Sequence, residues 1–311
     1  MRGSSLLRFL DRYLGIPLIF ILGLFRKKKV MPEVRHIGIL KTAGIGDTVL
    51  LSGIVQDLKG YQLTFFAGPS NYEMAQLLGC NVVKVPVGSP LKAIKLIRQH
   101  PVDLWIDFGP WPRINALFSY FAKAKYRVGF KSKGEHRHFI YDKAVVHSKD
   151  IHEMDNFRRL IDSKQSPPRI KALGKTVDNR IALHMFPAGS TAEARKWPKE
   201  RWVQLIEYLT AKGYECILTG CEADKRDNPD LTITSLKLKE AVDLLSTCRV
   251  IISVNTGILH LAAAMQKPVI AFPDVNPPHR WSAIGEKVTT LNKDITQIQV
   301  EDVARALNSY C

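Results

Sequence analysis

A single carboxylate stands at the end of a glycine-rich loop near the start of the globular sequence. This loop, residues 41–47, follows a buried strand expected over His36–Leu40 and ends at Asp47, and a helix is expected from Thr48 to about Lys59. The loop lacks the Gly-Lys-Ser/Thr ending of a Walker loop, and it does not match the G-x-G-x-x-G dinucleotide fingerprint. Asp47 is therefore either an N-cap of the helix or a general base at the carboxyl end of the first strand, where open α/β sheets bind ligands.

A second loop combines small residues with hydroxyl groups and two cations. It spans residues 186–198 and contains Ser190, Thr191, Arg195 and Lys196. Hydroxyls followed by two cations suit a diphosphate better than a structural salt bridge does. Farther along, Glu222 follows a strand expected at Cys216–Thr219, where its carboxylate could accept hydrogen bonds from ribose hydroxyls or cap a helix.

A third loop predicts an anion site. The turn Asn255-Thr256-Gly257 joins a buried strand expected at Val250–Val254 to an Ala-rich helix expected at Ile258–Met265, and a further strand is expected at Val269–Phe272. Such a turn leaves backbone N–H groups unpaired at the helix start, where a phosphate can bind. The alternative is an ordinary turn with Thr256 as the cap. His260 adds a polar group near the helix start, and a lone histidine there is more often structural than catalytic.

These loops must be positioned by strands that alternate with helices in both halves of the chain. In the first half, further strands are expected at Gln62–Ala67, Val82–Val87 and Leu104–Phe108, separated by helical patterns. This alternation predicts an α/β fold with doubly wound parallel sheets. The Pro-containing residues 166–179 predict a linker, which divides the chain into an N-terminal segment (1–33), a first Rossmann-like domain (34–165) and a second one (180–311). Two such domains would face each other across a cleft.

Positive charge is concentrated in the N-terminal half of the sequence. The net charge is +16; residues 1–30 hold seven Lys/Arg against one Asp, and residues 92–150 hold twelve Lys/Arg against five Asp/Glu. This asymmetry indicates an anionic partner: a membrane, a nucleic acid or a phosphorylated substrate. The candidates to bind phosphate or carboxylate groups include Arg113, Lys123, Lys125 and Arg127. The alternative is a solvated basic face.

The N-terminal segment predicts contact with a membrane surface. Residues 13–25 are uncharged and mostly apolar, and Arg26-Lys27-Lys28-Lys29 follows them. A helix of this length is about 20 Å long, too short for a hydrocarbon core of about 30 Å. Basic residues on both sides argue against a secretory signal. We expect an interfacial anchor, the alternative being a helix packed on the core.

The five cysteines form no C-x-x-C pair. Neither a metal site nor a disulfide framework is therefore expected, and a reducing cytoplasm fits best. The basic segment comes with no recognisable nucleic-acid motif, so nucleic-acid binding is the weakest of the three partner classes.

Together the three loops resemble the heptosyltransferases of glycosyltransferase family 9. The resemblance runs from about residue 35 to the C-terminus and is carried by Gly46-Asp47, by the second loop with Arg195-Lys196-Trp197-Pro198, and by Thr256-Gly257 with His260-Leu261-Ala262-Ala263-Ala264. It implies the GT-B fold of two Rossmann-like domains. It also implies inverting transfer of a heptose from ADP-heptose to the lipopolysaccharide core, at the cytoplasmic face of the inner membrane.

The resemblance also implies a role for each candidate residue. Asp47 is similar to the base that deprotonates the acceptor hydroxyl, and the first domain would bind the anionic glycolipid acceptor. The second domain would bind the nucleotide sugar, with a diphosphate clamp, an adenine contact and a ribose contact at Ser190, Thr191, Arg195, Thr256, Gly257, Leu236 and Glu222. The nucleotide sugar is then a substrate, and no cofactor or metal is expected.

Two positions depart from the family pattern. The family usually has Asp before Thr-Gly, contacting the sugar, whereas this chain has Asn255, which brings no charge and leaves the donor sugar open. The family usually has Lys-Arg before Trp-Pro, whereas the order here is Arg195-Lys196. This order keeps the two positive charges but changes the reach and the fork geometry of the side chains that carry them. Two alternatives stay open: the same fold and mechanism with another nucleotide sugar, and a non-catalytic membrane-bound module that holds a nucleotide sugar or polyanion.

Overall fold

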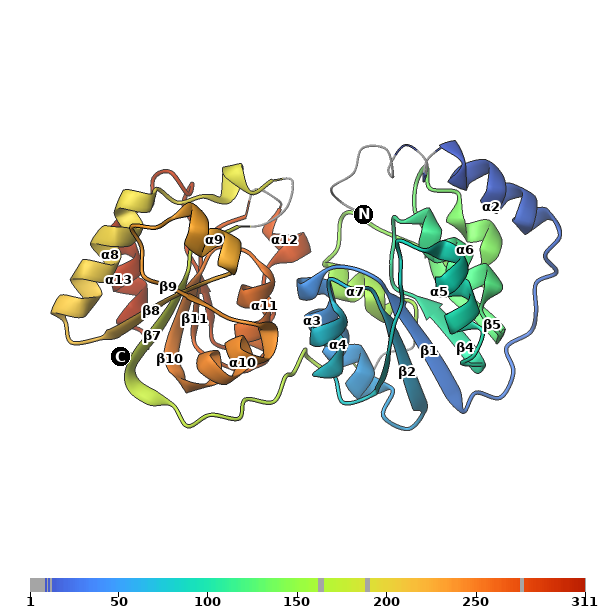
Figure 1. Cartoon of the computed structure of the whole chain (residues 1–311), viewed down its shortest axis with the longest axis horizontal. Helices are drawn as coiled ribbons and strands as arrows, with labels where there is room; N and C mark the ends of the chain where they lie inside the picture. The colour runs from blue at the N-terminus through green and yellow to red at the C-terminus, as the bar shows by residue number, and fades with distance from the viewer. Residues whose placement is uncertain are drawn as a thin grey trace. The chain divides into compact units, whose positions relative to one another are not determined.

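The computed structural model describes residues 9, 11, 13–161, 165–187, 191–274 and 277–310. The chain divides into two compact units, residues 1–166 and residues 167–311. Each unit contains one six-stranded parallel sheet with helices around it (Figure 1). The prediction of two doubly wound α/β domains is confirmed.

The sheet of the first unit has the strand order β3-β2-β1-β4-β5-β6. Its strands are β1 (His36–Lys41), β2 (Gln62–Ala67), β3 (Asn81–Lys84), β4 (Val102–Asp107), β5 (Ala124–Lys131) and β6 (Lys143–Val146). Its helices are α2 (Gly15–Leu24), α3 (Ile45–Asp57), α4 (Tyr72–Gln76), α5 (Pro90–Ile97), α6 (Arg113–Phe121), the 3₁₀ helix η1 (Arg137–Ile140) and α7 (Glu153–Arg158). This is the Rossmann order, in which the strand order reverses at the switch point between β1 and β4.

The second unit repeats the same topology. Its sheet order is β12-β11-β10-β7-β8-β9, with strands β7 (Val177–His184), β8 (Glu215–Gly220), β9 (Ile233–Ser235), β10 (Cys248–Ser253), β11 (Val269–Ala271) and β12 (Val288–Thr290). The helices are the 3₁₀ helix η2 (Glu193–Arg195), α8 (Lys199–Ala211), α9 (Glu222–Asp227), α10 (Leu238–Thr247), α11 (Gly257–Ala264), α12 (Pro278–Trp281) and α13 (Val300–Leu307). Here the switch point lies between β7 and β10, the strands that precede the second and third loops.

Apolar side chains on the two faces of each sheet form the cores. In the first unit Trp105 is fully buried between β4 and the helices and donates its Nε1–H to Ser119 at 2.9 Å. In the second unit Trp197 and Trp202 pack edge to face against each other, and both contact Phe272. These aromatic contacts fix helix α8 and the loop before it against the sheet.

Several elements differ from the sequence-based expectation. Helix α3 begins at Ile45 with Gly44 as its N-cap, so Asp47 lies inside the first turn. Strands β5 and β6 were not expected, because the lysines and arginines in and around them hide the alternation of buried and exposed side chains. Strand β7 begins at Val177, within the segment expected to be a linker. The short strands β9 and β12 carry too few residues to show a pattern.

Helix α2 packs on the first unit through one face only. Ile19 is fully buried against Ala116 and Ile140, and a Cβ on Gly23 would lie 2.5 Å from that of Phe139, so glycine is required at this contact. The opposite face is apolar and exposed, and it includes Leu14, Leu18, Ile21 and Leu24. No helix in the described part of the chain has the length and apolarity needed to cross a bilayer. The structure thus shows one face of α2 packed on the first unit, and the interfacial anchor stays a prediction.

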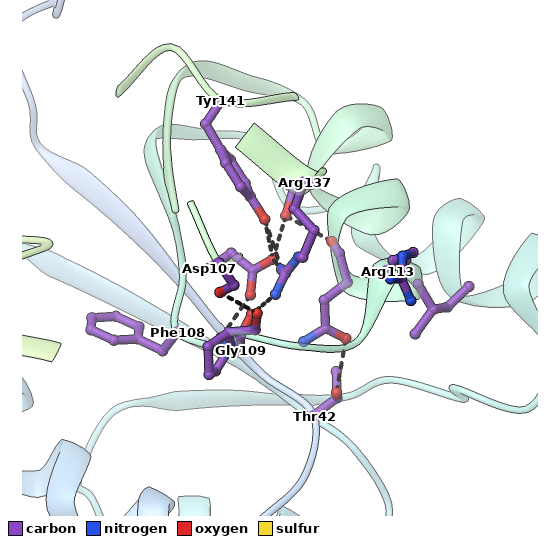
Figure 2. Close-up of polar contacts among 12 residues, drawn as sticks. Thr42, Asp107, Phe108, Gly109, Arg113, Arg137 and Tyr141 are labelled. Carbon is purple, nitrogen blue, oxygen red and sulfur yellow. Dashed lines mark hydrogen bonds and ion pairs between the residues drawn. The ribbon is translucent and has the colours of Figure 1, made fainter. Parts of the chain in front are cut away.

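A buried ion pair ties η1 to the carboxyl end of β4. Arg137 donates to the carboxylate of Asp107 and to the carbonyl oxygen of Gly109, and the Tyr141 hydroxyl donates to the same carboxylate at 2.7 Å (Figure 2). The side chains of Asp107 and Arg137 are completely buried. Burial beside the Asp107 charge raises the pKa of Tyr141 well above its usual value, so its hydroxyl remains a donor.

We predict that Arg137→Met destabilises the first unit by about 3–5 kcal/mol, because it leaves the charge of Asp107 buried and unpaired. Urea unfolding followed by tryptophan fluorescence measures the change. The double variant Asp107→Leu/Arg137→Met removes both charges and should recover most of the loss. Arg35→Met is the matched control, because Arg35 pairs with Glu33 at the surface, and its cost should stay below about 1 kcal/mol. An equal effect of the two Arg→Met changes would contradict the prediction.

Candidate functional site

The first unit brings the loops after β1 and β4 together at its switch point. Lys41 ends β1 and Asp107 ends β4, and the register pairs Leu40 with Asp107, so both strands end at the same edge of the sheet. Crevices at such switch points are the usual ligand sites of open parallel sheets. The loop that ends at Asp47 lies at this edge.

The carboxylate of Asp47 is held by a buried lysine. Lys41 Nζ lies 2.8 Å from Asp47 Oδ2, donates to the carbonyl oxygen of Phe108 at 3.2 Å, and stands over the ring of Phe157 at 5.0 Å. The lysine side chain is 5% exposed and that of Asp47 is 12% exposed. The N-cap position belongs to Gly44, so the capping alternative for Asp47 is not what the structure has. A partly accessible carboxylate fixed by one cation is arranged to accept a proton from a bound hydroxyl.

The backbone of this loop is fixed from several sides. Gly44 has a φ of 92°, and a Cβ there would lie 2.7 Å from Asp47 Oδ2, so only glycine leaves room for the carboxylate. The Thr48 hydroxyl donates to the Gly44 carbonyl at 2.7 Å. Asn71 Nδ2 donates to the Lys41 carbonyl and to the Thr48 hydroxyl, both at 2.9 Å. Thr42 donates to the Asn115 side chain at 2.9 Å. The position of Asp47 is therefore set by β1, β4 and α6 as well as by its own helix.

Two of the four predicted acceptor-binding residues are buried and bonded within the fold. Arg113 is 8% exposed at its side chain and pairs with Asp11 at 3.1 Å and Glu135 at 2.8 Å. Arg127 donates to backbone carbonyls at the end of α6, including that of Ser119 at 2.6 Å and that of Ala122 at 2.5 Å. A cation at a helix C-terminus satisfies carbonyls that the helix leaves open. Their acceptor contacts stay a prediction, and the structure gives both residues a role in the fold.

The other two predicted acceptor-binding residues lie at the opposite end of the strands, where β4 and β5 begin. Lys123 and Lys125 flank Ala124, which begins β5 and pairs with Val102, the first residue of β4. Asp47 follows the carboxyl end of β1. Strands advance about 3.3 Å per residue, so these lysines are displaced from the Asp47 edge by nearly the full length of a strand. An acceptor contact by these lysines could only be remote from Asp47.

In the second unit the third loop forms a helix N-terminus at the switch point. Ser253, which ends β10, pairs with His184, which ends β7. Thr256 is the N-cap of the eight-residue helix α11, and its Oγ is buried with no hydrogen-bond partner among the described residues. The first turn begins at Gly257 and contains no acidic residue. Unpaired N–H groups and an unpaired hydroxyl at a helix start are suited to bind an anion.

The second and third loops are joined by an arginine. Arg195 Nη1 donates to the carbonyl oxygen of Asn255 at 2.5 Å, and its Nε donates to that of Thr191 at 3.4 Å. Thr191, Arg195 and the turn at Asn255 therefore belong to one site. Lys196 instead pairs at the surface with Glu193 at 2.7 Å. Ser190 lies outside the described residues.

The amide of Asn255 is oriented by a carboxylate from the next strand connection. Its Nδ2 donates to Asp274 Oδ2 at 2.7 Å and to the carbonyl oxygen of Trp281 at 3.3 Å. Asn255 is 7% exposed. The negative charge that the family pattern would place at position 255 is thus present in this chain at position 274.

The remaining predicted donor residues lie around the same edge. Glu222 is exposed and begins α9, directly after β8, and Leu236 is half-buried directly after β9. Gly220 and Ser235, the last residues of β8 and β9, pair with each other, so Glu222 and Leu236 are near neighbours. His260 is buried in the first turns of α11.

Three polar residues at these edges were not singled out from the sequence. Lys41 and His184 each end a strand directly after three apolar residues, and Asp274 follows an apolar strand two residues after Phe272. His184 Nδ1 donates to the carbonyl oxygen of Thr219 at 3.1 Å, and burial lowers the pKa of His184 below the usual value, which favours the neutral ring. A polar residue ending an apolar strand is the sequence signal that could have identified all three.

Comparison with known proteins gives a consistent result. The family model "Glycosyltransferase family 9 (heptosyltransferase)" matches residues 94–308. The chain is 23% identical over 216 residues to lipooligosaccharide heptosyltransferase 2 of Haemophilus influenzae, covering 57% of this chain and 62% of that protein. It is 22% identical over 207 residues to lipopolysaccharide heptosyltransferase 2 of Salmonella typhimurium, covering 53% and 59%. The chain thus spans about three fifths of the length of these relatives.

Solved structures share the fold. The Escherichia coli ADP-heptose lipopolysaccharide heptosyltransferase II superposes with a TM-score of 0.75 at 16% identity, covering 88% of this chain and 98% of that one. The Escherichia coli heptosyltransferase WaaC with ADP superposes with a TM-score of 0.74 at 17% identity, covering 89% and 100%. At these identities the likeness is one of architecture.

We predict that Asn255→Asp destabilises the second unit above neutral pH, because it sets a second carboxylate against Asp274. Two adjacent carboxylates share a proton, so the pKa of one rises above its unfolded value of about 4. The loss should therefore be full above the raised pKa and shrink steadily as the pH falls from the raised pKa toward the unfolded value. A rise of about two units would cost roughly 3 kcal/mol at high pH. Thermal unfolding from pH 8 down to pH 5 measures it.

The matched control for this experiment exchanges the two residues. Asn255→Asp/Asp274→Asn keeps one carboxylate and one amide in contact, so its stability should return to near that of the unchanged chain. A single variant as stable as the unchanged chain at pH 8 would show that the Asn255–Asp274 hydrogen bond does not persist in solution.

Proposed function

The chain belongs to glycosyltransferase family 9, and we propose that it transfers a heptose, or a closely related sugar, from a nucleotide sugar to a lipopolysaccharide core acceptor with inversion. The two doubly wound domains correspond to the GT-B architecture. Support for the substrate class comes from the relatives named as lipopolysaccharide and lipooligosaccharide heptosyltransferases. Support for an ADP-linked donor comes from the Escherichia coli structure with ADP.

The observation that carries the proposal is the Asp47 carboxylate, fixed by Lys41 at the switch point of the first unit. In an inverting transfer one base removes the proton of the acceptor hydroxyl as its oxygen attacks the anomeric carbon. Asp47 is the proposed base. Lys41 is a positioning residue: its ammonium group holds one carboxylate oxygen and leaves the other to face the acceptor.

The second requirement of the reaction is to stabilise the departing diphosphate. The N-terminus of α11, the Thr256 hydroxyl and the cation Arg195 gather at one point of the second unit. Preorganised donors aimed at developing negative charge lower the barrier of such a step. We assign the diphosphate to this point, with Glu222 and Leu236 on the side of the ribose and the base. The reaction so described needs no protein nucleophile, metal or cofactor.

The donor sugar is assigned to the pair Asn255 and Asp274. An amide oriented through its nitrogen presents its oxygen as an acceptor for sugar hydroxyls. Screening ADP-, UDP- and GDP-linked sugars by thermal shift separates the ADP-heptose proposal from the same mechanism with another donor. A ligand at 100 times its dissociation constant adds about 2.7 kcal/mol to stability.

We propose further that the protein works at the cytoplasmic face of the inner membrane, held there by α2. The exposed face of this helix carries apolar side chains, and a run of four basic residues follows the helix directly. Apolar insertion combined with attraction to anionic headgroups is the usual basis of interfacial binding. A glycolipid acceptor would be met at the same surface.

Asp47→Asn tests the catalytic assignment. We expect transfer from ADP-heptose to fall by about 10²–10⁴-fold in kcat, the range that a general base contributes. The KM for the donor should change little, because the donor is assigned to the other unit. A cooperative urea unfolding transition of the first unit checks that the variant is folded. The control is Glu73→Gln, at an exposed acid of the same unit, which should keep full activity. Undiminished transfer by Asp47→Asn would leave only the non-catalytic binding module.

Leu18→Gln/Ile21→Gln tests the anchor. These side chains are 42% and 51% exposed, so the fold should tolerate the change. Full burial of one such side chain in lipid contributes about 1.5–3 kcal/mol. Because Leu18 and Ile21 are each about half exposed, the pair should contribute about that much, and binding to phosphatidylcholine vesicles should fall at least about tenfold. Vesicle sedimentation measures it, with Leu91→Gln as the control because Leu91 is exposed on α5 of the same unit. Equal binding by the three proteins would count against the anchor.

A further inference from the structure

A cavity of about 520 Å³ lies at the amino ends of the strands of the first sheet, remote from Asp47. His36, Val102 and Ala124, at the amino ends of β1, β4 and β5, contribute to its wall. Since β1 is parallel to its neighbours, Lys41 at its other end is about 17 Å away along the strand. The cavity is therefore separate from the proposed catalytic site. Its volume is within the range of small-molecule sites.

The wall of this cavity is strongly basic. Its charged residues are Lys29, Lys123, Lys125, Arg127 and Asp103. The one carboxylate is already satisfied: Asp103 accepts the backbone N–H groups of Arg35 and His36 at 3.0 Å each and pairs with Lys125 at 2.7 Å. The hydrogen bond from Lys125, followed by these backbone donors, lowers the pKa of Asp103 well below its usual range. Asp103 thus stays ionised, and a net positive charge remains for a ligand.

Part of this positive charge is not compensated by the protein. Lys29 and Lys123 are exposed, and neither has a carboxylate within 4.0 Å in the part of the chain that the structure describes. Burial and the nearby charge of Arg26 lower the pKa of Arg127 to about 10. An anion in the cavity would reduce the repulsion among these cations and give the two lysines a partner.

We propose that this cavity binds the phosphate group of an anionic phospholipid, as a headgroup site distinct from the acceptor site. The lipid is favoured over a free phosphate by the segment that supplies Lys29. Leu24, Phe25, Val30 and Met31 flank the basic run, and they are 67%, 80%, 92% and 54% exposed. A phospholipid offers a phosphate to the cavity and acyl chains to these apolar side chains at the same time.

The path of the chain agrees with this arrangement. Figure 1 shows α2 and the extended segment after it running along one outer side of the first unit, down to the start of β1. His36, the first residue of β1, lines the cavity. The segment is anchored beside the cavity, because Arg26 pairs with Asp142 at 2.5 Å and the backbone N–H of Lys29 donates to the same carboxylate at 3.1 Å. The proposal rests on the membrane-association part of the proposed function and is independent of sugar transfer.

Vesicle binding of the full chain tests the proposal. Phosphatidylcholine vesicles with and without phosphatidylglycerol are compared for the unchanged chain and for Lys123→Gln/Lys125→Gln. Each lysine near an anionic surface contributes about fivefold, so the double variant should lose about 25-fold in affinity for the anionic vesicles and nothing for the neutral ones. Lys123→Gln alone, which breaks no ion pair within the described residues, should lose about fivefold.

The matched control is Lys92→Gln/Lys95→Gln, which removes two exposed lysines from α5 of the same unit, away from the cavity. Its loss should be small. An equal loss in the two double variants would mean a diffuse field rather than a site, and would overturn the proposal.

A second arm separates the two sources of phosphate. Monomeric dihexanoyl phosphatidylglycerol should raise the melting temperature of the unchanged chain but not that of Lys123→Gln/Lys125→Gln. Inorganic phosphate at the same concentration should have a smaller effect, and equal stabilisation by the two would overturn the lipid assignment. Neither experiment contains a sugar donor or acceptor, so its result can be interpreted even if the protein does not transfer a sugar. If Leu18→Gln/Ile21→Gln binds vesicles normally while Lys123→Gln/Lys125→Gln does not, the anchor is excluded and the headgroup site is retained.

Discussion

The ion pair between Lys41 and Asp47 is the interaction around which the first unit is built. A lysine that is 5% exposed needs a close anion and further acceptors, because the cost of burying its charge is otherwise several kcal/mol. Asp47 provides the anion and the Phe108 carbonyl provides the acceptor, so one ammonium group ties β1 to helix α3 and to the loop after β4. The strained turn at Gly44 and the contacts of Asn71 and Thr42 keep that geometry. A carboxylate held this firmly suits a reaction that needs a base at one defined point.

The second unit uses the same topology for the opposite electrostatic purpose. Its switch point presents a helix N-terminus, a hydroxyl and the guanidinium of Arg195, all of which attract negative charge. The loops that do this are joined by hydrogen bonds between Arg195 and Asn255 and between Asn255 and Asp274. A carboxylate in one domain and groups that attract negative charge in the other would supply the two parts that the proposed inverting transfer requires.

The basic residues of the N-terminal half fall into two groups with different tasks. Arg113, Arg127 and Arg137 are buried and bind carboxylates or carbonyls that the fold would leave unsatisfied. The guanidinium group suits this task, since it donates in a planar fork and is weakly hydrated. Lys29, Lys123 and Lys125 are exposed around one cavity. The buried arginines thus stabilise the domain, and the exposed lysines form the surface that we propose for an anionic partner.

The sequence alone determined the two parallel α/β domains, because buried strands and helices leave distinct periodicities. It also located the three loops, because glycine and hydroxyl residues interrupt the apolar pattern where each strand ends. It also placed Asp47 and Arg195 in loops at strand ends. Only the tertiary structure decided what each side chain contacts. Asp47 pairs with Lys41 instead of capping α3, Arg113 and Arg127 have structural partners, and Asp274 supplies the carboxylate beside Asn255. Lys41 and Asp47 lie in one connection, whose turn at Gly44 brings them together. The contacts Arg113–Glu135 and Asn255–Asp274 join residues from different strand connections. Their distance depends on strand order and register, which periodicity along one segment does not encode.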